Sequence, residues 1–290
     1  MKKYTNHILL HFIVLLWGTT GVLGKLIQEN AYALVWHRFI LAILAMAVWL
    51  KFKRISIRIS QRDLWQLLGV GGIIALHWIA FFGAIQIANI SVTLVCLSSG
   101  SLFAAFLEPL FFKRHIHMHE ILFGLSLIFG IALIFTITPQ FQLGMGIAIF
   151  SAFASSLFLV LNGILIRKHN AVVMSFYEML GGFLVLSVLA CVLGMTQTVF
   201  ILPTPQDFGW LLILAVVCTA FAFVVSVQVM KVIKPFDVVL AVGMEPVYGI
   251  LLAYFVFADS ERMRPQFYWG AGIVLATIYA NVLVKRRMKG

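Results

Sequence analysis

Residues 91–112 read SVTLVCLSSGSLFAAFLEPLFF, and this apolar stretch decides the fold. As a helix rising about 1.5 Å per residue, it spans about 33 Å, which is enough to cross the hydrocarbon core of a bilayer. The stretch contains Glu108 and Pro109, and the cations Lys113 and Arg114 follow directly. A second apolar stretch, residues 235–257, repeats the acid–proline pair as Glu245-Pro246. We interpret the chain as two copies of one unit built around these helices.

The composition indicates an all-α membrane protein. Hydrophobic residues make up 62% of the 290 residues, charged residues only 11%, and the mean hydropathy is +1.05. A soluble protein carries roughly 25% charged residues. The net charge of +11 does not indicate a nucleic-acid partner, because the cations form short clusters between apolar runs. The three cysteines lie inside apolar runs, where they provide neither a disulfide framework nor a metal-binding spacing.

We expect ten transmembrane helices, and the distribution of charge gives their orientation. The predicted spans are residues 7–27, 32–50, 64–87, 91–112, 120–138, 144–166, 172–194, 208–232, 235–257 and 267–284. This count places 17 of the 21 lysine and arginine residues on one side and three on the other, with Arg38 inside a span. By the positive-inside rule, both termini of this multi-pass protein are cytoplasmic. The expected location is the inner cell membrane.

An internal repeat divides the chain near its middle. Gly100 aligns with Glu245 at an offset of 145 residues, and Gly124 aligns with Gly270 at an offset of 146. An odd number of helices per unit makes the second unit enter the membrane from the opposite face. The prediction is therefore two inverted five-helix repeats, residues 1–140 and 141–290, an architecture common in secondary transporters.

Several motifs, taken in order, resemble the EamA type of the drug/metabolite transporter superfamily. They are Leu16-Trp17-Gly18 and Lys25 in the first span, Arg38 in the second, Pro235 and Glu245-Pro246 in the ninth, and the Glu261-Arg262 turn. The resemblance covers the whole chain and implies a ten-helix transporter with a central cavity, often an exporter of amino acids or related metabolites. The chain departs from the common pattern at His77-Trp78 and in the LEPLFFKRHIHMHE segment, residues 107–120.

Ionisable groups at membrane depth are costly, so each is a candidate for function. Glu245 lies near the middle of its span, and Pro246 frees the carbonyl of Val242. Acid and carbonyl together form a candidate proton or cation site; the alternative is a structural carboxyl bonded to a neighbouring helix. His77 is suited to proton coupling and Trp78 to stacking on a substrate. Their alternative is a neutral histidine bonded across helices, with the aromatic residues facing lipid.

Arg38 either holds a substrate carboxylate or extends toward the outer headgroups. Glu178 is its counterpart in the second unit, so the two are expected at opposite mouths and not as a pair. For Glu108 we favour an ion pair with Lys113 or Arg114 at the membrane surface.

Further candidates for the cavity wall are Trp17, Asn162, Tyr177 and Gln228. The alternating His115, His117 and His119 are a weak metal pattern, so no metal or cofactor is predicted. Phosphate-binding and hydrolase motifs are absent from the sequence, which argues against an ATP-driven pump. We do not expect an enzyme, because no two of the candidate residues lie within one short motif.

The leading hypothesis is a secondary transporter, an exporter of small metabolites working by alternating access, with Glu245 and His77 carrying coupling protons. Kinks at Pro109 and Pro246 are expected to open the two mouths in turn. The alternatives are a membrane-embedded enzyme acting on a lipid-linked substrate and a passive channel. The expected partners are the lipid bilayer, a small-molecule substrate and protons.

Overall fold

The computed structural model describes residues 2–113, 115 and 118–288, and within them every regular element is a helix. In chain order these are α1 (Lys2–Gly18), α2 (Thr20–Leu26), α3 (Ala31–Phe52), α4 (Gln61–Ile87), α5 (Ile90–Leu97), α6 (Gly100–Phe112), α7 (Met118–Ile137), η1 (Pro139–Phe141), α8 (Gln142–Leu165), α9 (Ala171–Val192), α10 (Thr196–Phe200), α11 (Pro205–Leu212), the π-helix η2 (Ile213–Phe221), α12 (Ala222–Val229), α13 (Pro235–Val242), α14 (Glu245–Phe257), η3 (Ala258–Glu261) and α15 (Pro265–Met288).

The chain is a multi-pass helical membrane protein. Among the described residues, eight helical stretches of 22 to 27 residues are long and apolar enough to cross a bilayer. They coincide with eight of the ten expected spans. The other two expected spans correspond to α7, whose apolar segment Ile121–Ile137 is shorter, and to α15, whose sequence ends in lysine and arginine.

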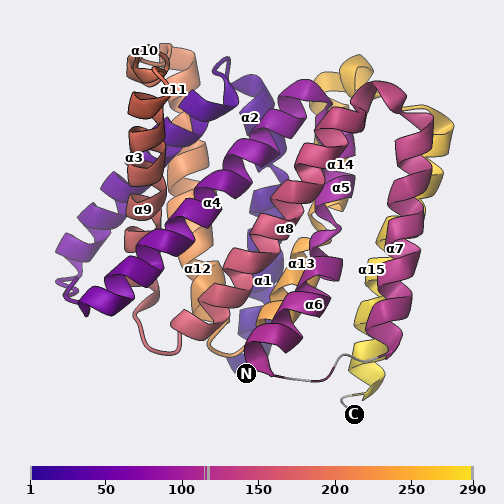
Figure 1. The fold of residues 1–290 in the computed structure, drawn as a ribbon, viewed down its shortest axis with the longest axis horizontal. Coiled ribbons are helices and arrows are strands. Elements are labelled where there is room, and N and C mark those ends of the chain that lie inside the picture. The colour runs from indigo at the N-terminus through magenta and orange to yellow at the C-terminus, as the bar shows by residue number, and fades with distance from the viewer. Residues whose placement is uncertain (1, 114, 116–117, 289–290) are drawn as a thin grey trace.

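The helices form one bundle, with one pair of helices at its edge. Helix α4 packs against α8 and α9, while α7 and α15 lie side by side at the right of Figure 1. Helix α1 begins and α15 ends at the lower end of this view, where the connections 53–60, 166–170 and 230–234 also lie. These connections carry seven lysine and arginine residues, so we call this end the basic end.

Three of the membrane helices are interrupted near the middle of the bundle. Helix α1 gives way to α2 at Thr19, α5 to α6 at Ser98 and Ser99, and α13 to α14 at Gly243 and Met244. The last break fits the missing N–H of Pro246, which cannot bond to the carbonyl of Val242. Interrupted backbone at membrane depth is tolerated where it lines a cavity or is buried in protein.

The kink expected at Pro109 is not where the chain breaks. Pro109 lies inside α6, and the interruption falls ten residues earlier, at Ser98 and Ser99. There, Ser98 Oγ donates to the carbonyl of Leu94 and Ser101 Oγ donates to the carbonyl of Ser98. Both carbonyls also accept from backbone N–H groups, of Ser98 and Ser101, so the hydroxyls add a second bond to each at the break.

Helix lengths recur at nearly constant spacing along the chain. Helices α3 and α9 each contain 22 residues and begin at Ala31 and Ala171, which are 140 positions apart. Helices α5 and α13 contain 8 residues each, and α6 and α14 contain 13 each, with starts 145 positions apart in both cases. The offset of 145 is the one found in the sequence for Gly100 and Glu245.

Glycines bring α4 and α9 into backbone contact. A Cβ atom at Gly71 would overlap the carbonyl oxygen of Glu178, and one at Gly181 would overlap the backbone of Leu68. Small residues allow this close approach between membrane helices.

Candidate functional site

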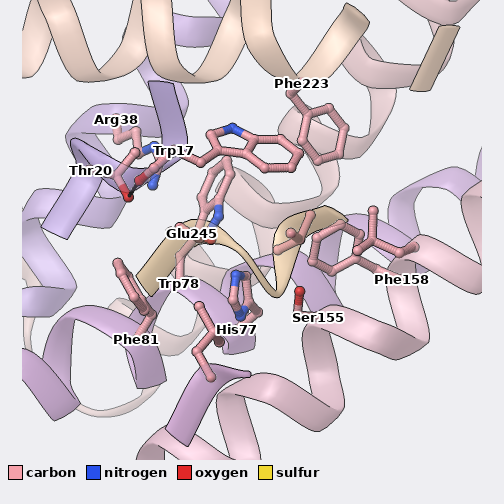
Figure 2. A pocket seen from close by; sticks show the side chains of 13 residues that line it. Trp17, Thr20, Arg38, His77, Trp78, Phe81, Ser155, Phe158, Phe223 and Glu245 are labelled. Atoms are coloured by element: carbon pink, nitrogen blue, oxygen red, sulfur yellow. Dashed lines mark hydrogen bonds between the residues drawn. The ribbon is translucent and has the colours of Figure 1, made fainter. Parts of the chain in front are cut away.

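A cavity lies inside the bundle, where the interrupted helices meet α3, α4, α8 and α12. The empty space there, including its open mouth, amounts to about 510 Å³. The lining residues are Trp17, Thr20, Arg38, His77, Trp78, Phe81, Leu97, Ser155, Phe158, Leu159, Phe223, Val242 and Glu245 (Figure 2).

Glu245 brings a carboxylate into this cavity from a helix start. It is the first residue of α14, directly after the break at Gly243 and Met244, and it is 5% exposed. Among the described residues, its carboxylate has no hydrogen-bond or ion-pair partner. The unpaired N–H groups of the first helical turn favour a negative charge at this position. Glu245 can therefore receive a proton or the amino group of a bound molecule.

Arg38 provides a fixed positive charge in the same cavity. Its Nε donates to Thr219 Oγ1 at 2.6 Å, and its Cζ lies 3.8 Å from the centroid of the Trp78 ring. The side chain is 3% exposed and lies inside the bundle, so it does not extend toward headgroups. The terminal nitrogens make no hydrogen bond or ion pair within the described part of the chain. They are available to a carboxylate or phosphate.

His77 is held from one side and open on the other. Its Nδ1 lies 3.0 Å from the main-chain oxygen of Ser151 and 2.8 Å from Ser151 Oγ, while Ser151 Oγ donates to the main-chain oxygen of His77. Because Nδ1 donates to that carbonyl, Nε2 is the ring nitrogen left for the cavity (Figure 2). The histidine is thus both bonded across helices and part of the cavity wall.

Aromatic residues make up half of the remaining wall. The Trp17 indole Nε1 donates to the main-chain oxygen of Cys218 at 3.1 Å. Trp78 packs against Phe39 at 4.8 Å between ring centroids and against Phe223 at 6.5 Å. Phe158 lies 5.5 Å from the ring of His77. The cavity therefore combines an apolar interior with one acid, one guanidinium and one imidazole.

The π-helix η2 anchors two of these groups and was not anticipated from sequence. Thr219 accepts from Arg38 and donates to the carbonyl of Leu214, five residues earlier, at 2.8 Å. The carbonyl of Cys218 holds Trp17. π-Helical turns often occur at functional sites. Thr219, Ser151 and Ser155 also escaped prediction, because a lone hydroxyl in an apolar run gives no signal of its partner.

Three residues predicted for the cavity wall, Asn162, Tyr177 and Gln228, lie outside it. With its amide nitrogen turned toward the carboxylate, Asn162 donates to Glu178 Oε1 at 2.7 Å, and Glu178 is fully buried. The Tyr177 hydroxyl donates to the main-chain oxygen of Ile57 at 2.9 Å, at the basic end. Arg38 and Glu178 do not pair with each other, as expected.

The predicted membrane-surface and metal contacts fall partly on undescribed positions. Glu108 is buried; of its two expected partners, Lys113 is exposed and Arg114 lies outside the described residues. His117 also lies outside them, and the described residues contain no group of three side chains that could hold a metal ion.

Comparisons with known proteins agree with this architecture. The model of the EamA-like transporter family matches residues 6–136 and 142–283. A solved structure, described only as the crystal structure of a protein, superposes with a TM-score of 0.70 over 98% of this chain and 99% of its own. Its sequence identity is 15%, so the similarity concerns the fold. No curated protein matches the chain.

Proposed function

The chain belongs to the EamA-like transporter family, and on that basis we propose that it is a secondary transporter that exports a small metabolite, such as an amino acid, by alternating access and with proton coupling. The observation that carries the proposal is the pair of charges in one cavity. Glu245 faces it without a partner among the described residues, and the terminal nitrogens of Arg38 face it as well. A zwitterion with an apolar side chain fits this cavity: its amino group pairs with Glu245, its carboxylate pairs with Arg38, and its side chain packs against the aromatic rings.

The inverted repeat is the proposed basis of alternating access. The equal lengths of α3 and α9, α5 and α13, and α6 and α14, at offsets of 140 and 145, support two units over residues 1–140 and 141–290. Counting α7 and α15 gives five spans in each unit. The breaks at Ser98–Ser99 and Gly243–Met244 then occupy equivalent positions, and each gives one unit a hinge.

We infer the orientation of the protein in the membrane from the distribution of its lysine and arginine residues. The cations at the basic end favour a cytoplasmic location for this end and for both termini, in the inner cell membrane. Export then begins at the basic end and finishes at the opposite mouth.

The proton-coupling role of Glu245 is tested by transport under an imposed pH gradient. Metabolite profiles of medium and cells, with and without overexpression, first identify the exported compound. Purified protein in liposomes is then compared with Glu245→Gln, which keeps the shape of the side chain but removes its charge. We expect the wild type to accumulate the compound against its gradient and the variant to equilibrate it only. Equal accumulation by both proteins would remove the coupling role.

The same liposomes separate transport from the two alternatives. A transporter shows flux that saturates with substrate, whereas a passive channel shows flux that rises linearly. An enzyme releases a chemically changed product. Membership of the family supports transport. Glu29→Gln, in the connection between α2 and α3, is the control for Glu245→Gln, because it also removes one carboxylate.

A further inference from the structure

A second hollow lies on the outside of the bundle and is wholly apolar. It lies between Ala45, Met46 and Trp49 of α3 on one side and Val216, Ala220 and Val224 of η2 and α12 on the other, with about 740 Å³ of empty space including its mouth. All of its lining side chains are apolar. We call it the apolar groove. It shares no residue with the cavity described above.

The groove has the depth of one bilayer leaflet. Trp49 lies three residues before the end of α3 at Phe52, close to the basic end. Val216 lies 13 residues before the end of α12 at Val229, which corresponds to about 20 Å along a helix. One leaflet contributes about 15 Å of hydrocarbon. The groove therefore reaches from the membrane surface to the middle of the membrane, as an acyl chain does.

A cation stands at the shallow end of the groove. Lys53 Nζ lies 5.1 Å from the centroid of the Trp49 ring and 5.4 Å from that of Phe52. Lys53 is exposed and is joined in the same connection by Arg54 and Arg58. These charges lie at headgroup depth, where positive side chains attract anionic lipids. Charge complementarity thus selects a negatively charged headgroup over a zwitterionic one.

The groove and the cavity lie on opposite sides of one π-helix. Val216 and Ala220 of η2 line the groove, whereas Thr219 of η2 accepts from Arg38 and the Cys218 carbonyl accepts from Trp17. An occupant of the groove therefore packs directly against the segment that holds two cavity residues in position.

We propose that the apolar groove binds one acyl chain of an anionic phospholipid, whose headgroup lies beside Lys53, and that this chain stabilises the π-helix that anchors Arg38 and Trp17. The ligand is a membrane lipid and not the transported molecule. The site can therefore be tested without knowledge of the substrate.

Lipid selectivity is measured with the full-length protein in phosphatidylcholine vesicles that contain a spin-labelled lipid. We expect a larger motionally restricted component for labelled phosphatidylglycerol than for labelled phosphatidylcholine. Lys53→Gln should reduce this preference about fivefold, whereas Arg262→Gln, an exposed cation at the opposite end, should leave it unchanged. Equal restricted components for the two lipids in the wild type would overturn the headgroup assignment.

Filling the groove tests where the chain binds. Ala45→Phe fills it from α3 and Val224→Phe from α12, so failure of one variant to fold leaves the other informative. Both should lose the restricted phosphatidylglycerol component. Ala276→Phe, at an exposed position of α15, is the matched control and should keep it. Retention of the component by both folded groove variants would overturn the site.

The effect on the π-helix is measured by hydrogen exchange of peptides that cover residues 213–221. Adding phosphatidylglycerol to phosphatidylcholine vesicles should slow exchange in this segment of the wild type but not of Ala45→Phe. Unchanged exchange in the wild type would overturn the stabilisation of η2. The outcomes of the lipid-binding and hydrogen-exchange experiments do not depend on whether the protein transports a given metabolite.

Discussion

Arg38 Nε donates a 2.6 Å hydrogen bond to Thr219 Oγ1, which joins the charged side chain of α3 to the hydroxyl of a π-helix. The hydroxyl is orientated by its own bond to the carbonyl of Leu214. The guanidinium is further fixed by the face of Trp78, 3.8 Å from Cζ. The direction in which Arg38 presents its terminal nitrogens is therefore set by two partners from different helices.

Replacing the hydroxyl by a methyl group tests this arrangement. Thr219→Val keeps the shape of the side chain and leaves Arg38 Nε without an acceptor, a loss of about 1–3 kcal/mol for a hydrogen bond to a charged group. We expect KM for the exported compound to rise about tenfold with kcat little changed. Thr277→Val removes the bond to Ser126 far from the cavity and serves as the control. A similar KM in both variants would contradict the positioning role of Thr219.

Exchange of Arg38 for lysine separates charge from geometry. Lysine keeps the positive charge but loses both the planar stack on Trp78 and the Nε donor to Thr219. We expect Arg38→Lys to retain measurable flux with a KM raised tenfold or more, and Arg38→Met to abolish flux of a substrate that carries a carboxylate. The measurement is initial flux into liposomes over a range of substrate concentrations. Equal loss in both variants would mean that charge alone does not hold the substrate.

The sequence predicts the broad architecture and the charged groups but not their partners. Family membership, expected from Trp17, Arg38 and Glu245-Pro246, is confirmed. An acidic residue within an apolar run can be recognised from the sequence alone, because the cost of removing its charge from water depends on the apolar residues around it in the chain. The partner of Arg38 is not visible, since Thr219 lies 181 positions away and belongs to a π-helix formed by nine residues of an apolar run.

Of the two kinks expected at prolines, only the one at Pro246 coincides with a break in a helix. The break beside Pro246 was predicted correctly, because a missing N–H acts locally. The break at Ser98 and Ser99 contains no proline, and serine hydroxyls there bond to the carbonyls of Leu94 and Ser98. Tyr177 was assigned to the cavity from its place in an apolar span, but its hydroxyl bonds to Ile57 at the basic end.

The contacts between Ser151 and His77 predict that loss of the Ser151 hydroxyl is tolerated, because the main-chain oxygen of Ser151 still holds the ring. Ser151→Ala removes two of the contacts to His77 but keeps the main-chain oxygen at 3.0 Å from Nδ1. The orientation of the ring is therefore retained, and we expect a loss of about 1 kcal/mol in stability with proton-driven transport preserved. His77→Gln should abolish the proton dependence of flux. Loss of that dependence in Ser151→Ala as well would show that the hydroxyl, not the carbonyl, positions the ring.

Glu261 ties three segments together at the end opposite the basic end. Its carboxylate accepts from Lys25 Nζ at 2.7 Å, from the backbone N–H groups of Ile90 and Ser91, and from Ser91 Oγ at 2.9 Å. Its side chain is fully buried, so Glu261→Ala removes the carboxylate partner of Lys25 and leaves the two buried N–H groups of Ile90 and Ser91 unpaired. We expect a loss of about 2–5 kcal/mol, because each buried donor left unsatisfied costs about 1–3 kcal/mol. Chemical unfolding in detergent followed by circular dichroism measures it.

Lys25 is the weaker partner of that pair, because 28% of its side chain remains exposed. Water can replace part of what Lys25→Met removes, so this variant should lose clearly less stability than Glu261→Ala. Equal losses would show that the ion pair, and not the capping of α5 by Glu261, provides the stabilisation.

The contact between α4 and α9 predicts opposite outcomes for two neighbouring glycines. A methyl group at Gly71 would overlap the carbonyl of Glu178 and lie 2.7 Å from the backbone nitrogen of Gly182, and a backbone cannot move aside as a flexible side chain can. Gly71→Ala should therefore destabilise the protein by about 1–3 kcal/mol. At Gly69 no described atom beyond its own helix lies within 4 Å of an added Cβ, so Gly69→Ala gains helix propensity at no steric cost. We expect Tm in detergent to fall for Gly71→Ala and to stay level or rise slightly for Gly69→Ala. An equal fall in both would place the cost in the loss of glycine itself and not in the helix contact.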